Sequence, residues 1–112
     1  MNRTGRKPAD DVKRRIVAAR TDVLKADAWF VYLLRCADDS LYTGITKDVK
    51  RRTEQHNAGT ASRYTRTRLP VQLEYQEPHA TRSSALKREA EVKAMARLEK
   101  ESLITRAAKR SR

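Results

Sequence analysis

The chain has 112 residues and a formal net charge of +12, with 26 Lys and Arg against 14 Asp and Glu. This length suits one small domain with an appendage and excludes two independent cores of ordinary size. The single cysteine, Cys36, excludes an intramolecular disulfide and a cysteine-based zinc finger, and it indicates a reducing compartment.

The charge and the hydropathy of the sequence indicate its class of binding partner and its cellular location. The positive field favours nucleic acid as the partner. No apolar run approaches the roughly 18–20 residues that would span a bilayer, and no apolar stretch of a signal peptide follows the basic N-terminus. We therefore expect a cytoplasmic protein, free or associated with the nucleoid, with no membrane partner.

Residues 1–27 are expected to form a basic arm and a helix ahead of the domain. The first ten residues are polar and carry glycine and proline, which is typical of a disordered segment. Apolar residues then recur at helical spacing, at Val12, Ile16, Ala19 and Val23. The amphipathic helix that this predicts is interpreted as a strut against the domain, with a DNA-binding arm as the alternative.

Three segments have the pattern of β-strands. Residues 29–36 are apolar, aromatic and β-branched and predict a central strand. The polar stretch 37–40 separates them from 41–45, which predicts an antiparallel hairpin. Residues 71–77 alternate apolar and polar side chains, as in a half-buried third strand, before Pro78 ends them.

Helices are predicted between and after these strands. Thr46 or Asp48 can cap a helix that ends near Asn57, and a basic loop over 58–70 follows. Further helices are expected over about 81–94 and 96–104, before a basic, frayed tail at 105–112. The sequence thus predicts an α/β (α+β) domain over 28–104, a three-stranded antiparallel sheet flanked by helices.

Two short motifs in the hairpin resemble those of a known family. Val31-Tyr32-Leu33 is followed ten residues on by Tyr42-Thr43-Gly44, and helices at 48–57 and 85–89 come next. This order resembles the GIY-YIG nuclease domain, especially its small single-domain bacterial members. The first motif lacks the family's glycine and the second has threonine for isoleucine, while both tyrosines and Gly44 match.

The two helices carry charged residues on faces that should be apolar. Arg52 shares a helical face with Val49, and Glu89 lies between Ala85 and Val92. An isolated buried charge is costly. Either the two charges form a structural ion pair, or they converge on a metal and a phosphate, which is the interpretation that the two tyrosines favour.

The resemblance implies a role for each of these residues. It implies that Glu89 binds Mg²⁺ (or Mn²⁺), that Arg52 neutralises the scissile phosphate, that Tyr32 is the general base and that Tyr42 contacts phosphate or water. A tyrosine with an ordinary pKa near 10 is a poor base at neutral pH. We therefore expect the metal and an arginine to lower the pKa of Tyr32 or to share its proton.

Three further residues are candidates for the same site. Arg35 matches a basic position of the family and could act on Tyr32, or it could be an exposed strand arginine. His56 could be a base or a phosphate contact, or a histidine at a helix end. Gly44 is expected to let nucleic acid or a neighbouring chain approach the backbone closely.

The basic loop adds a candidate nucleic-acid surface. Arginines alternate with hydroxyls and one aromatic ring at Arg63, Tyr64, Arg66 and Arg68, with no acidic residue among them. This composition is typical of a surface that follows phosphates and stacks a base. The alternative is a solvated basic loop.

Together these features predict a Mg²⁺-dependent DNA endonuclease, with a structure-specific role in repair or recombination as the narrower hypothesis. RNA is not excluded as a substrate, and a monomer is favoured. The first alternative is a module that keeps the fold and binds nucleic acid without cutting it. The second is a small basic accessory protein of the ribosome or nucleoid.

Overall fold

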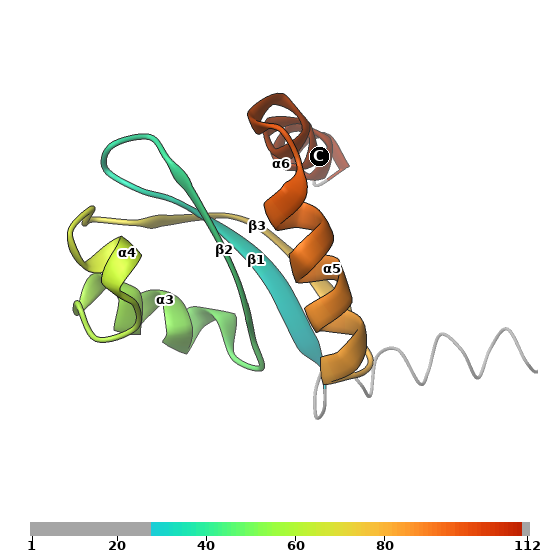
Figure 1. Cartoon of the computed structure of the whole chain (residues 1–112), viewed down its shortest axis with the longest axis horizontal. Helices are drawn as coiled ribbons and strands as arrows, with labels where there is room; N and C mark the ends of the chain where they lie inside the picture. The colour runs from blue at the N-terminus through green and yellow to red at the C-terminus, as the bar shows by residue number, and fades with distance from the viewer. Residues whose placement is uncertain (1–27, 111–112) are drawn as a thin grey trace, which may run out of the picture.

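The computed structural model of the protein describes residues 28–110, so the predicted N-terminal helix lies outside the described residues. The elements follow in the order β1 (Trp29–Arg35), β2 (Leu41–Thr46), α3 (Val49–Asn57), α4 (Arg63–Arg66), β3 (Gln72–His79), α5 (Arg82–Ala94) and α6 (Arg97–Arg110) (Figure 1). None of the described helices is long and apolar enough to cross a membrane.

The three strands form one antiparallel sheet in the order β2-β1-β3. The predicted α+β fold, with a three-stranded sheet flanked by helices, is confirmed. β1 is central because its residues are apolar on both faces, as the unbroken run from Val31 to Leu34 requires. β2 is an edge of this sheet, so its outer side is open to neighbouring side chains.

Alternation along β1 divides the core into two layers. Tyr32, Leu34 and Cys36 point to one face, where they pack with Val49 of α3 and with Val71. Val31 and Leu33 point to the other face and pack against α5. Figure 1 shows the same division, with α3 and α4 on one side of the sheet and α5 and α6 on the other.

Short polar side chains fix where the helices begin. Asp48, Ser62 and Thr81 each accept a hydrogen bond from the backbone N–H three residues on, at the starts of α3, α4 and α5. Asn57 then bonds both backbone groups of Val71, at 2.7 and 3.0 Å, which holds the end of α3 against the start of β3. These contacts position the loop that carries α4 over the sheet.

The C-terminal helix is longer than the sequence predicts. The helix was expected to end near Ile104, but α6 continues to Arg110. Ala107 and Ala108 line a hollow beside β3 in this extra stretch. Alanine has a high helix propensity. This propensity and the small apolar contact with the sheet favour a helix through residue 110, where a frayed tail was predicted.

Candidate active site

Tyr32 lies at the centre of the candidate site, and its position depends on Gly44. The two residues are paired across β1 and β2. A Cβ atom on residue 44 would lie 2.6 Å from the Tyr32 hydroxyl oxygen and 2.7 Å from its Cζ. The close approach predicted at Gly44 therefore exists, but the approaching group is the Tyr32 ring, and the predicted contact between Gly44 and nucleic acid does not fit this space.

A chain of hydrogen bonds leads from Tyr32 into the protein. The Tyr32 hydroxyl oxygen lies 2.9 Å from His56 Nε2, and His56 Nδ1 lies 2.7 Å from Thr65 Oγ1. Thr65 Oγ1 is in turn 3.0 Å from Ser62 Oγ. His56 and Thr65 are fully buried and Tyr32 nearly so. The contact between Tyr32 and His56 brings two predicted catalytic residues together, and Thr65 is a site residue that the sequence did not indicate.

Burial controls the protonation of this chain. It raises the pKa of Tyr32 to about 12, and Tyr42 and Glu89 act in the same direction while Arg52 opposes them. It lowers the pKa of His56 to about 4, with the positive charge of Arg52 acting in the same direction. His56 is therefore a neutral imidazole near pH 7, with one nitrogen that donates and one that accepts.

Tyr42 joins this chain through ring contacts. Its centroid lies 6.4 Å from that of Tyr32 and 5.0 Å from that of His56, in tilted and edge-to-face arrangements. On its outer side it stacks with Tyr64 of α4, at 6.0 Å between centroids. Tyr42 is partly exposed, so it forms the boundary between the buried chain and the surface.

Arg52 lies on the same face of α3 as His56, as the four-residue spacing predicts. Its Nη1 donates to Gln55 Oε1 at 3.0 Å. Its positive charge opposes the rise in the pKa of Tyr32 and contributes to the fall in the pKa of His56. Arg52 and Glu89 form no ion pair with each other, so the structural bridge that the sequence left open is absent between these two described side chains.

Glu89 has a half-buried side chain and one described ionic partner. Its Oε2 lies 3.4 Å from Lys93 Nζ, one turn further along α5, and its own side chain is 18% exposed. No group of three His, Cys, Asp or Glu gathers within residues 28–110. A single carboxylate beside an open surface nevertheless fits Mg²⁺, which commonly binds through one or two carboxylates, phosphate oxygens and water.

Arg35 does not belong to this site. It lies three residues after Tyr32 on β1 and therefore points to the opposite face of the sheet. Its guanidinium binds Glu101 of α6 at 2.7 Å, Glu74 at 3.4 Å and Asp39 at 3.0 Å. The predicted catalytic role of Arg35 is wrong in this geometry: the residue anchors α6 to the sheet.

The basic loop divides into a fixed part and a free part. Arg68 donates to Asp38 Oδ2 at 3.0 Å and to the Tyr64 carbonyl at 2.8 Å, and its guanidinium covers the Tyr64 ring at 3.8 Å. Arg63 and Arg66 are exposed and line a hollow of about 430 Å³ with residues 59–62. Of the three predicted phosphate contacts, Arg63 and Arg66 are free to meet nucleic acid, whereas Arg68 fastens α4 to the hairpin.

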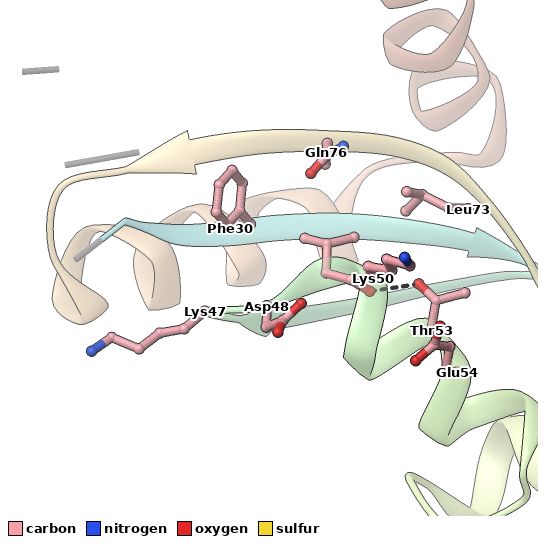
Figure 2. Close-up of a pocket in the computed structure, with 9 residues that line it drawn as sticks. Phe30, Lys47, Asp48, Lys50, Thr53, Glu54, Leu73 and Gln76 are labelled. Atoms are coloured by element: carbon pink, nitrogen blue, oxygen red, sulfur yellow. Dashed lines mark hydrogen bonds between the residues drawn. The ribbon is translucent and has the colours of Figure 1, made fainter. Parts of the chain in front are cut away.

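Another hollow, of about 490 Å³, lies away from this chemistry. Figure 2 shows Phe30, Leu73 and Gln76 of the sheet facing Lys50, Thr53 and Glu54 of α3 across it. The Thr53 hydroxyl donates to the Val49 carbonyl at 2.8 Å and is thereby satisfied within its own helix. None of the predicted site residues lines this hollow.

The arrangement is that of a small α+β domain in which a strand tyrosine, a buried histidine, an arginine and a helix carboxylate lie near one another beside β2. Residues 28–101 match the model of the GIY-YIG catalytic domain. The chain belongs to the GIY-YIG family, which is a family of nucleases.

The chain is also similar to bacterial UPF0213 proteins. UPF0213 proteins of Staphylococcus aureus strains Mu3 and Mu50 are 53% identical over 78 residues, which cover 70% of this chain and 95% of each relative. The solution structure of the UPF0213 protein BH0048 of Bacillus halodurans is 40% identical, with a TM-score of 0.46, over 70% of this chain and 83% of that one. The match to the family model and the 53% identity to the Staphylococcus aureus proteins confirm the resemblance seen in the sequence.

Proposed function

We propose that this protein is a metal-dependent endonuclease that hydrolyses phosphodiester bonds in DNA by direct attack of water. The observation that carries the proposal is the buried chain from Tyr32 through His56 to Thr65, which lies beside Arg52 and Glu89.

The chain gives Tyr32 a route for its proton. With His56 neutral, the Tyr32 hydroxyl donates to Nε2 and the Nδ1–H donates to Thr65 Oγ1. As the water oxygen bonds to phosphorus, Tyr32 accepts the proton of the water and passes its own to Nε2, and the P–O bond on the opposite side breaks. The leaving oxygen takes a proton from solvent water, and His56, whose pKa of about 4 disfavours the charged form, returns its proton through Tyr32 to solvent. A tyrosine paired with a buried acceptor in this way need not become a tyrosinate.

The charges around Tyr32 suit a phosphate. Arg52 supplies positive charge beside the hydroxyl, where negative charge develops in the transition state. A Mg²⁺ or Mn²⁺ ion held by Glu89 would add positive charge for the phosphate oxygens and would lower the pKa of Tyr32, which the bare carboxylate raises. Without such an ion, Lys93 is the described cation that balances Glu89.

The experiment is a cleavage assay on supercoiled, branched, flapped, nicked and single-stranded DNA and on RNA, with Mg²⁺ or Mn²⁺ and with EDTA. We expect cleavage that requires the metal and that disappears in Tyr32→Phe and Glu89→Gln. Preference for branched or flapped DNA would support a role in repair or recombination. Tight binding to these substrates with no cleavage under any condition would instead establish the non-catalytic module.

A further inference from the structure

A hollow of about 240 Å³ adjoins the catalytic tyrosines at the open edge of β2. Its walls come from four elements: Leu41, Tyr42 and Thr43 of β2, Tyr64 of α4, Lys93 of α5 and Lys100 of α6. Tyr42 belongs both to this hollow and to the ring cluster with Tyr32 and His56. A strand of nucleic acid whose scissile phosphate lies at Tyr32 therefore has this hollow as its neighbouring position.

The two lysines bring positive charge to the hollow from different helices. Lys100 forms no ion pair with any residue between 28 and 110, and the neighbouring Glu101 is paired with Arg35 and Arg97. Lys93 is 58% exposed, and its described ionic partner is Glu89 at 3.4 Å. Lysine binds phosphate as a flexible point charge, and two of them converging beside two aromatic rings suit a nucleotide better than a metal or an apolar ligand.

We propose that Lys93 and Lys100 form a phosphate subsite that holds the phosphodiester next to the scissile one, with Tyr42 and Tyr64 as the wall for its sugar or base. The inference rests on the proposed function and adds a position for the substrate strand. The strand runs from the free arginines of α4, past Tyr42, to the lysines of α5 and α6.

Lys93 also couples this subsite to the metal ligand. In the free protein its charge is shared with Glu89. A cation held by Glu89 would compete with Lys93 for that carboxylate, which would leave the Lys93 ammonium available to the neighbouring phosphate.

The test measures binding rather than cleavage. A short fluorescein-labelled oligothymidylate is titrated by fluorescence anisotropy in EDTA, over a series of salt concentrations, with the Glu89→Gln protein as the parent. Lys93→Ala and Lys100→Ala in this background should each reduce the slope of log K against log[salt] by about 0.7, the change expected for one lost contact to a single strand. Lys87→Ala, an exposed lysine of α5 outside the hollow, is the matched control and should change the slope less.

A second measurement follows the wall of the hollow by NMR. Amide signals of Tyr42 and Thr43 should shift on adding the same oligonucleotide, and the shift should shrink in the Lys93→Ala/Lys100→Ala protein. The subsite is overturned if this double variant binds with the slope and the shifts of Lys87→Ala. If the lysine effects are present but the wild-type protein never cleaves, the proposed function fails and the binding subsite stands. An absence of any DNA binding would reject both.

Discussion

The ring of Tyr32 occupies the space that a side chain on Gly44 would need: a Cβ there would meet the hydroxyl oxygen at 2.6 Å and Cζ at 2.7 Å. Gly44 of the second hairpin motif therefore leaves the space that Tyr32 of the first motif occupies. Because residue 44 has no side chain, the Tyr32 ring can lie across the neighbouring strand and reach His56.

Gly44→Ala should consequently move Tyr32 and damage catalysis. Tyr32 is 1% exposed, and its ring cannot swing away without disturbing the packed core, so we expect a stability loss of about 1–3 kcal/mol. Cleavage should fall more than this loss of folded protein explains. Thermal unfolding and the cleavage rate give the two effects, and in a Tyr32→Ala background the same substitution should cost little stability. An equal cost in both backgrounds would show that Tyr32 is not the obstacle.

The pKa of His56 predicts how stability depends on pH. The folded protein keeps this imidazole neutral down to about pH 4, whereas the ordinary value is 6.5. Between these values the unfolded chain binds a proton that the folded chain does not, so the free energy of unfolding falls as the pH drops from about 6.5 to about 4, by up to about 3 kcal/mol.

Urea unfolding across this pH range measures that dependence. His56→Gln should lose the part of the pH dependence that belongs to His56, whatever its own stability at pH 7. His79→Gln, at the other described histidine, should keep it. Profiles of equal slope in the wild type and His56→Gln would contradict a buried neutral imidazole.

Glu89→Gln should separate the metal ligand from the fold. Its described ion pair is with an exposed lysine, and such pairs contribute only about 0–1 kcal/mol. We therefore expect an unchanged melting temperature, retained DNA binding and no metal-dependent cleavage. Glu91→Gln, an exposed neighbour on α5 paired with Arg88, is the control and should cut normally. A Glu89→Gln protein that cuts at the wild-type rate with Mg²⁺ would remove Glu89 from the site.

Substituting Arg35 by alanine should mainly lower stability, whereas substituting Arg52 by alanine should mainly lower kcat. Arg35→Ala removes contacts to Glu101, Glu74 and Asp39, which should cost about 1–3 kcal/mol and loosen α6. The cleavage rate per folded molecule should hardly change. Arg52→Ala removes positive charge beside Tyr32 and should lower kcat about 100-fold or more with a smaller effect on stability. Unfolding curves and kcat, measured for both variants, separate the two roles. A large loss of kcat in folded Arg35→Ala would support the catalytic role that the sequence predicted for Arg35.

The sequence predicted the sheet and the longer described helices, because these depend on local patterns, whereas the short helix α4 lies where a basic loop was expected. Alternation along β1 places Arg35 on the face opposite Tyr32, since residues three apart on a strand face opposite sides. The catalytic role predicted for Arg35 came instead from its resemblance to a basic position of the family. Thr65 and Lys93 were missed for another reason. Nothing local marks Thr65 as a buried partner of His56, because that contact exists only once the loop after α3 has folded over the sheet.

Thr65 provides the sharpest test of the proton route. If its Oγ1 accepts the Nδ1–H of His56, it fixes the tautomer that leaves Nε2 free to accept from Tyr32. Thr65→Val keeps the shape but removes the acceptor, so kcat should fall about 10-fold or more, while KM and DNA affinity stay near the wild type. Thr65→Ser restores the hydroxyl and should recover most of kcat. The tautomer of His56, followed by ¹⁵N NMR, should change in Thr65→Val and return in Thr65→Ser. A Thr65→Val protein with normal kcat would show that Tyr32 does not need His56 held in one tautomer, and a loss that Thr65→Ser fails to repair would assign Thr65 to packing alone.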